Sequence, residues 1–146
     1  MKLKPGIALR YGTFNGCTNL TTVYNLNKCV ALNTENYEPG VFEGCRSLRN
    51  SDLSSCDYIG WATFLGCTSL TSMKLEEGAD IKGSAFNGCS NLGIVYNLNK
   101  CINIEDYAFF GCSALTNNNV SKCNYIGDSA FQGCSAITQI KVKPGV

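Results

Sequence analysis

Apolar residues recur along this chain in one pattern that is copied six times. Each copy reads Phe-x-Gly-Cys-x-x-Leu, with Ile in the last position of the sixth copy. Successive copies are 28, 22, 22, 23 and 22 residues apart, counted between their Phe residues, which are Phe14, Phe42, Phe64, Phe86, Phe109 and Phe131. A pattern repeated at a nearly fixed interval predicts a repeat array in which each copy builds one structural unit.

The residues of one unit predict a short strand and a tight turn. Apolar and polar residues alternate from Leu70 to Leu75, which is typical of a strand with one buried face. Residues 129–131 (Ser-Ala-Phe) predict a single helical or 3₁₀ turn, and Gly133 would end it in a left-handed conformation. Intervals of this length are typical of leucine-rich solenoids and too short for helical-pair or propeller repeats. We therefore expect an α/β leucine-rich-repeat solenoid of about six turns of ~22 residues, with short parallel strands on one face and short helical or 3₁₀ turns on the other.

A longer repeat is superimposed on the first. Residues 1–72 align with residues 73–139, and the only large gap in this alignment is a five-residue insertion within 31–39. A third copy begins at 140–146. The loop at 33–40 is thus the feature that breaks the array, and insertions of this kind belong on one face of a solenoid. We expect one domain, residues 1–146, built as a doubled three-turn block.

The ten cysteines follow the repeat. Six belong to the Phe-x-Gly-Cys copies, and Cys29, Cys56, Cys101 and Cys123 form a second series. A free cysteine behaves as a small buried hydrophobe, so each series predicts a column of packed thiols in the interior. Disulfides between neighbouring coils stay open as an alternative, because stacked strands lie within disulfide reach.

Composition argues against several classes of function. The formal net charge is +1 with 16% charged residues, which is no basis for binding nucleic acid. No apolar run is long enough for membrane insertion, and the N-terminus lacks the apolar core of a secretory signal. The chain has no His and no Cys-x-x-Cys, and its acidic residues are spread along the sequence. We therefore predict neither an enzyme nor a cofactor or metal site.

One outward strand position per coil forms a candidate binding row. A strand face is the usual binding surface of a curved solenoid. The same residue types return at equivalent positions of the two blocks, so duplication of solvated residues explains the row equally well, whereas a binding surface is expected to break internal symmetry. The row consists of Lys2, Tyr24, Asp52, Lys74, Tyr96, Asn119 and Lys141.

The two ends form a candidate self-association site. A solenoid without caps exposes apolar core and unpaired strand edges, and such edges recruit other chains. Head-to-tail stacking of copies would bury both ends and would grow into a filament. The candidate end-to-end contacts are Leu3, Lys4, Phe14, Ile137, Ile140 and Val142.

Residues 115–137 resemble a known family. They run Leu-x-x-x-x-Val-Ser-x-Cys, then Tyr-Ile-Gly-x-x-Ala-Phe-x-Gly-Cys-x-x-Ile, and are similar to the BspA-type (Treponema pallidum type) leucine-rich repeat. The resemblance implies a non-enzymatic module for binding or adhesion, with a protein or glycan partner at the cell surface or outside the cell. The alternative is a structural protein that polymerises with copies of itself end to end.

Overall fold

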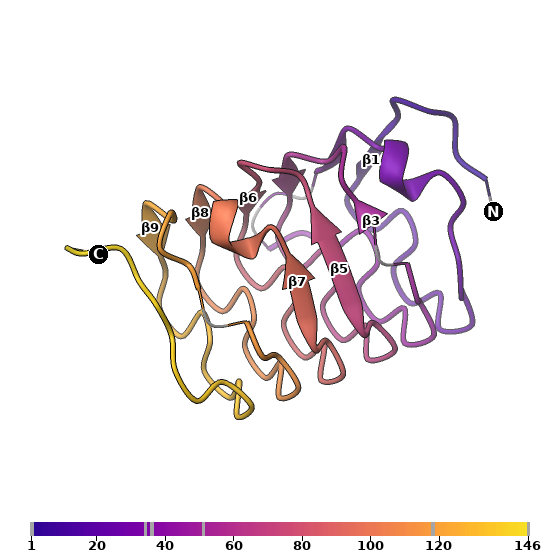
Figure 1. Cartoon of the computed structure of the whole chain (residues 1–146). Coiled ribbons are helices and arrows are strands. Elements are labelled where there is room, and N and C mark those ends of the chain that lie inside the picture. The colour runs from indigo at the N-terminus through magenta and orange to yellow at the C-terminus, as the bar shows by residue number, and fades with distance from the viewer. Residues whose placement is uncertain (1, 34, 36, 51, 118, 146) are drawn as a thin grey trace.

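The chain winds into a solenoid of stacked coils, with its termini at opposite ends (Figure 1). This computed structural model describes residues 2–33, 35, 37–50, 52–117 and 119–145. The predicted loop at 33–40 includes residues 34 and 36, which lie outside these ranges.

Two parallel sheets run along the solenoid. Each coil adds a strand to the longer sheet, whose order is β1-β2-β4-β6-β8-β9, and the shorter one has the order β3-β5-β7. Sequence reasoning predicted the strand after the repeat Leu, which is the shorter sheet, and missed the longer one. The longer sheet consists of β1 (Ala8–Arg10), β2 (Ala31–Asn33), β4 (Tyr58–Ile59), β6 (Asp80–Ile81), β8 (Asn103–Ile104) and β9 (Tyr125–Ile126). The shorter sheet consists of β3 (Asp52–Leu53), β5 (Ser72–Leu75) and β7 (Ile94–Tyr96).

Two details of the predicted coil are wrong. The six strands of the longer sheet enclose five intervals, so the solenoid has about five turns and not six. The predicted helical turn at 129–131 is a hydrogen-bonded turn. In the preceding coil, the N–H groups of Phe109 and Gly111 donate to Ala130 and Gln132 at 2.8 Å. Because the carbonyl oxygens of Ala130 and Gln132 accept these bonds from the preceding coil, they are not available to the hydrogen bonds of a continuing helix.

The 3₁₀ helices of the described residues lie elsewhere in the coil. They are η1 (Leu26–Lys28) and η2 (Leu98–Lys100), in the two segments that carry an extra residue. Each begins after an asparagine in the left-handed conformation, Asn25 at φ 65° and Asn97 at φ 67°. Both asparagines also donate from Nδ2 to the preceding coil, to the carbonyl oxygens of Leu3 (2.8 Å) and Leu75 (2.9 Å). The extra residue is thus absorbed at a position fixed by contacts between coils.

The repeat phenylalanines stack as one interior column, which confirms the predicted core. Neighbouring ring centroids lie 5.1–5.5 Å apart and the rings are within 11° of parallel. The four central rings have no exposed surface, Phe14 is 8% exposed, and Phe131 is partly buried. Each ring covers its neighbours, so the column joins all the coils into one core.

Five of the six motif cysteines form a second interior column. The thiol of each donates to the carbonyl oxygen of the Phe one coil earlier, as in Cys89 to Phe64 at 3.1 Å; the others are Cys45, Cys67, Cys112 and Cys134. Nine of the ten cysteines are buried, Cys17 is exposed, and all ten are free thiols. The predicted burial is confirmed.

The motif glycines stack at the turn in the left-handed conformation, and Gly133 makes the closest approach to its neighbour. Gly133 has φ 80°, which confirms the predicted left-handed conformation. A Cβ atom on Gly133 would lie 3.3 Å from the Cα and N atoms of Gly111 in the preceding coil. A side chain here would push the coils apart as well as strain the backbone.

Candidate functional site

The predicted strand row is assembled on the shorter sheet. Asp52 pairs with Lys74, and Lys74 pairs with Tyr96. Isolated bridges join Lys2 to Tyr24 and Asn119 to Lys141. The row therefore consists of three groups of residues that pair in register, which we call runs. Its two tyrosines, Tyr24 and Tyr96, are 62% and 53% exposed.

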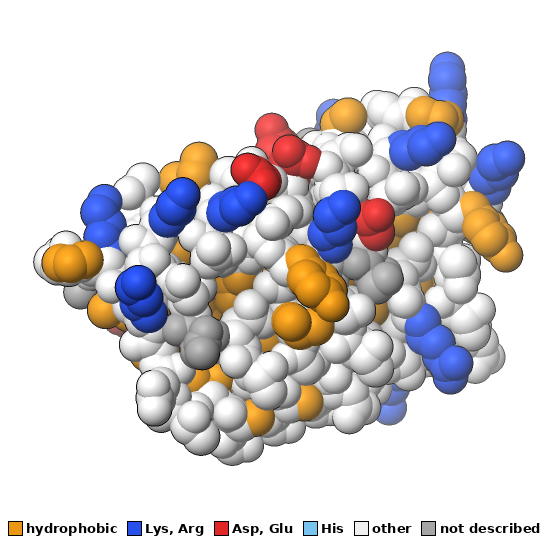
Figure 2. Space-filling model, in the orientation of Figure 1, with side chains coloured by type: hydrophobic (Ala, Val, Ile, Leu, Met, Phe, Trp, Pro, Cys, Tyr) orange, Lys and Arg blue, Asp and Glu red, His pale blue; other side chains and the backbone are white. Residues whose placement is uncertain are grey.

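Asparagine side chains join these runs. Asn50 accepts the N–H of Val23 and donates to its carbonyl oxygen, both at 2.8 Å. Asn117 makes the same pair of bonds with Val95, at 2.7 and 2.8 Å. Figure 2 shows this face of the molecule, where the basic side chains are spread singly and do not gather into one patch. The row is exposed and ordered, but its residues are the ones that the two blocks share.

The predicted end contacts differ between the two ends. Leu3 and Phe14 are only 9% and 8% exposed, while Lys4 is exposed. At the other end, Ile137 is partly buried, and Ile140 and Val142 are 42% and 45% exposed. The C-terminal end thus offers more apolar side-chain surface than the N-terminal end.

A site that sequence reasoning missed lies on the outward face of the longer sheet. Strand register aligns Tyr58, Asp80, Asn103 and Tyr125 in one row across β4, β6, β8 and β9. The residues directly after these strands add Lys82, Glu105 and Asp106 to the same face. Asp80 is brought beside the consecutive residues Glu105 and Asp106 because each coil returns to the same place.

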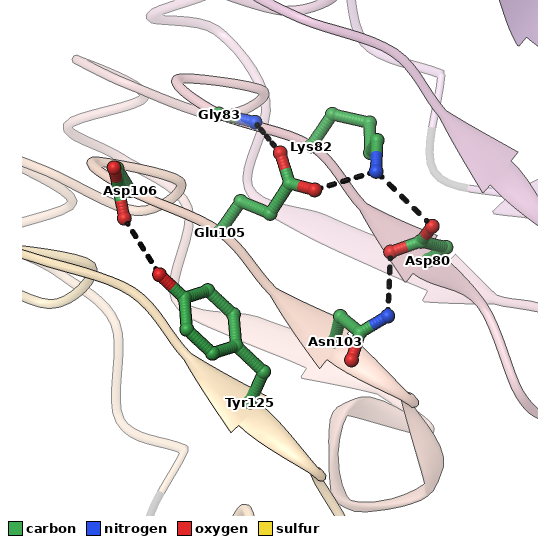
Figure 3. A network of polar contacts seen from close by, with 7 residues as sticks. All are labelled: Asp80, Lys82, Gly83, Asn103, Glu105, Asp106 and Tyr125. Atoms are coloured by element: carbon green, nitrogen blue, oxygen red, sulfur yellow. Dashed lines mark hydrogen bonds and ion pairs between the residues drawn. The ribbon is translucent and has the colours of Figure 1, made fainter.

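A network of ion pairs and hydrogen bonds organises this face (Figure 3). The Lys82 ammonium lies 3.3 Å from Asp80 and 2.5 Å from Glu105. Glu105 Oε2 accepts the N–H of Gly83 at 3.2 Å, and Asp80 accepts from the side-chain amide of Asn103 at 3.3 Å. These side chains link the two coils of β6 and β8, and both ion pairs are partly shielded from water.

Asp106 is fixed separately by the last coil. Its Oδ1 accepts the backbone N–H of Asp128 at 2.8 Å and the hydroxyl of Tyr125 at 3.3 Å. The charge of Asp106 raises the pKa of Tyr125, because ionising the phenol would place a second negative charge beside the carboxylate. The pKa of Lys82 is also raised: burial acts to lower it, but the hydrogen bond to Glu105 and the charges of Asp80 and Glu105 outweigh burial.

Aromatic side chains complete the site. Trp61 packs directly against Gly83, since a Cβ atom on this glycine would be 2.4 Å from Cζ3 of the indole. Tyr37, in the inserted loop, packs on Trp61 with ring centroids 5.5 Å apart. These rings line a groove of about 440 Å³, which we call the aromatic–acidic groove. Its lining residues are Tyr37, Trp61, Gly83, Glu105, Asp106, Tyr107 and Tyr125.

One sequence signal could have pointed to this groove. Trp61 is the chain's single tryptophan, and it follows the Tyr-Ile-Gly segment at a position occupied by Asp128 in the second block. The groove residues lie at polar or variable positions of the repeat, which periodicity does not highlight. Among the residues that the structure describes, no group of three or more His, Cys, Asp or Glu side chains could hold a metal ion. None of the helices described here is long and apolar enough to cross a membrane.

Comparison with known proteins connects this architecture to a family. A model of the BspA-type leucine-rich repeat region, in six copies, matches residues 7–116 and, in an overlapping match, residues 35–146. Searches of curated proteins and of solved structures returned no match.

Proposed function

Because this chain belongs to the BspA-type leucine-rich-repeat family, we propose that it is a non-enzymatic binding module that holds a protein partner on the outward face of its longer sheet. The family suggests a repeat protein for protein interaction. A location at the cell surface or outside the cell is part of the proposal, since proteins with this repeat are often surface proteins.

The observation that carries the proposal is that the aromatic–acidic groove breaks the internal symmetry of the chain. Duplication keeps the residue type along most of the strand row, as in Tyr24 and Tyr96. In the groove, Trp61 corresponds to Asp128 and Gly83 corresponds to Tyr11. A surface that departs from the copied pattern is the one that matches an outside partner.

The composition of the groove also supports an interface with a protein. Its tyrosines are well exposed, with Tyr37 at 89%, Tyr125 at 49% and Tyr107 at 43%. Tyr and Trp are enriched at interfaces and at their hot spots, because large rings bury much area at low entropic cost. The strand row, Lys2 to Lys141, is the second candidate surface.

The proposal is tested with purified, immobilised matrix glycoproteins and isolated glycans as a binding panel. We expect saturable binding of the chain to at least one protein of the panel. The double variant Trp61→Ser/Tyr125→Ser should weaken it about tenfold or more, as expected when hot-spot aromatics are removed. Circular dichroism controls for folding. Unchanged affinity of a folded double variant would contradict the proposal.

A second candidate function is self-assembly, and the ends favour it. Strands β1 and β9 are the edges of the longer sheet and lie at opposite ends of the solenoid (Figure 1). Ile140 and Val142 are exposed at the C-terminal end. A second copy stacked head to tail would extend the sheet and cover these apolar side chains, and such a contact grows without closing.

A further inference from the structure

We propose that the aromatic–acidic groove binds a positively charged side chain, an arginine in particular, from a basic segment of the protein partner, with Asp106 as its counter-ion. This inference rests on the proposed binding function and names the chemistry that the groove recognises. It follows from the lining residues, from the way the same surface holds Lys82, and from the bonds of the two acidic residues in the groove.

The lining combines aromatic faces with negative charge. Four of its residues are aromatic, two are carboxylates, one is glycine, and none is basic. An aromatic ring attracts a cation placed within about 6 Å of its centroid, and a neighbouring carboxylate adds charge and hydrogen-bond acceptors. A groove with this lining favours a cation over an anion or a purely apolar group.

The same surface already holds one cation of its own. The Lys82 ammonium lies 5.6 Å from the centroid of the Tyr58 ring and bonds to Asp80 and Glu105. Ring, ammonium and carboxylates here come from three successive coils. Trp61, Tyr125 and Asp106 form a similar combination of aromatic rings and a carboxylate in the groove. The cation that would complete this second combination would come from a binding partner.

The bonds of the two groove carboxylates show which one is the counter-ion. Glu105 uses both oxygens, Oε1 for Lys82 and Oε2 for the N–H of Gly83. The bonds to Asp106 from Tyr125 and Asp128 both end on Oδ1. Within the described part of the chain, Oδ2 of Asp106 has no such bond. The charge of Glu105 is thus matched by Lys82, whereas Asp106 keeps acceptor capacity for a ligand.

Arginine fits this groove better than lysine. A planar guanidinium can stack on a ring and donate two hydrogen bonds to a carboxylate at the same time, whereas an ammonium is a compact, strongly hydrated charge. Trp61 contacts both Gly83 and Tyr37, and these contacts restrict the motion of its ring before a ligand stacks on it. We therefore expect arginine peptides to bind more tightly than lysine peptides.

The chain carries its own reporter for the test. Trp61 is the single tryptophan, so its fluorescence monitors the groove alone. The probe is a tetra-arginine peptide with blocked ends, titrated at low salt. Tetra-lysine, tetra-glutamate and a neutral tetrasaccharide of glucose serve as comparison ligands. We expect saturable fluorescence change with tetra-arginine, weaker change with tetra-lysine, and none with tetra-glutamate.

Two matched variants decide whether Asp106 is the counter-ion. Asp106→Asn keeps the side-chain shape and the acceptor for the Asp128 N–H, and should weaken tetra-arginine binding about fivefold or more through loss of a charge-assisted bond. Glu77→Gln is the control, because it also removes one negative charge, but Glu77 pairs with Lys100 and does not line the groove. It should leave the affinity unchanged.

Three results would overturn the inference. They are no saturable response to tetra-arginine, an equal loss of affinity in both variants, and tighter binding of the neutral tetrasaccharide, which would assign the groove to a glycan. Its failure can be told apart from failure of the proposed function. If a panel protein binds in a way that depends on Trp61 and Tyr125 but tetra-arginine does not bind, only the inference that the groove recognises a cation is refuted. If tetra-arginine binds but no panel protein does, only the proposal of a partner within the panel is refuted.

Discussion

At the scale of single residues, the cysteine column shows why a sulfur atom is repeated in the core. Each thiol of the column donates to the carbonyl oxygen of a Phe in the preceding coil, at 3.0–3.1 Å. Alanine would fill the space less well and would make no such bond. The sequence pattern predicts the column, but not the bond, because hydrogen bonding between coils leaves no trace in the spacing of residues.

Burial of the thiols predicts a dependence of stability on pH. Burial raises the pKa of Cys45 from 9.0 to about 11, and that of Cys56 and Cys101 to about 12. Between about pH 9 and 11 the unfolded chain loses thiol protons that the folded chain keeps, so the free energy of unfolding should fall as pH rises, by up to about 1.4 kcal/mol per pH unit for each buried thiol. Urea titrations at pH 8, 9 and 10 measure it.

A count of free thiols is the control for that experiment. After denaturation without reductant, an Ellman-type reagent should find most of the ten thiols, and Cys17 alone should react quickly in the folded chain. Fewer than about four free thiols would indicate cross-links between coils. Stability that stays flat to pH 10 would contradict the raised pKa values.

At the scale of the element, the structure of one coil depends more on its contacts with the adjacent coils than on local sequence patterns. The strand at 72–75 was predictable because its alternation has one buried face. Strands such as β4 and β8 were not, since two residues are too short to show a period. The turn at 129–131 was mistaken for a helix because its local pattern is compatible with one, and only the adjacent coil removes that option.

The phenylalanine column gives a prediction at this scale. Phe86→Ala should lower the free energy of unfolding by roughly 3–5 kcal/mol, because it opens a cavity between two stacked rings. Phe131→Ala is the matched control: this ring stacks on Phe109 alone and is partly buried, so we expect a clearly smaller loss. Urea unfolding measures both. A Phe86→Ala chain that melts within about a degree of the unmodified chain would refute the column.

At the scale of the whole molecule, the repeat determines the solenoid but not its partner. The repeat spacing and the phenylalanine and cysteine columns were predictable, since they rest on residues copied in every coil. The aromatic–acidic groove was not, because it depends on outward residues that differ between coils, such as Trp61 and Gly83. Only stacking of the coils shows that these residues are neighbours.

The ends of the molecule give a prediction about association. Lysines at both ends, Lys2 with Lys4 and Lys141 with Lys143, oppose head-to-tail stacking. If the ends associate, the mass from light scattering should rise above 15.8 kDa with concentration, and rise further with salt, which screens this repulsion. The variant Ile140→Ser/Val142→Ser should reduce it. A constant mass of 15.8 kDa, with no fibres in electron micrographs, would eliminate self-assembly.

We propose that the longer sheet, and not the strand row, carries the binding surface. Its most direct test compares two double variants against the protein of the panel that binds best: Trp61→Ser/Tyr125→Ser in the groove and Tyr24→Ser/Tyr96→Ser in the row, whose tyrosines are 62% and 53% exposed. We expect the dissociation constant to rise about tenfold or more for the groove pair and to stay unchanged for the row pair. A rise confined to the row pair would contradict it.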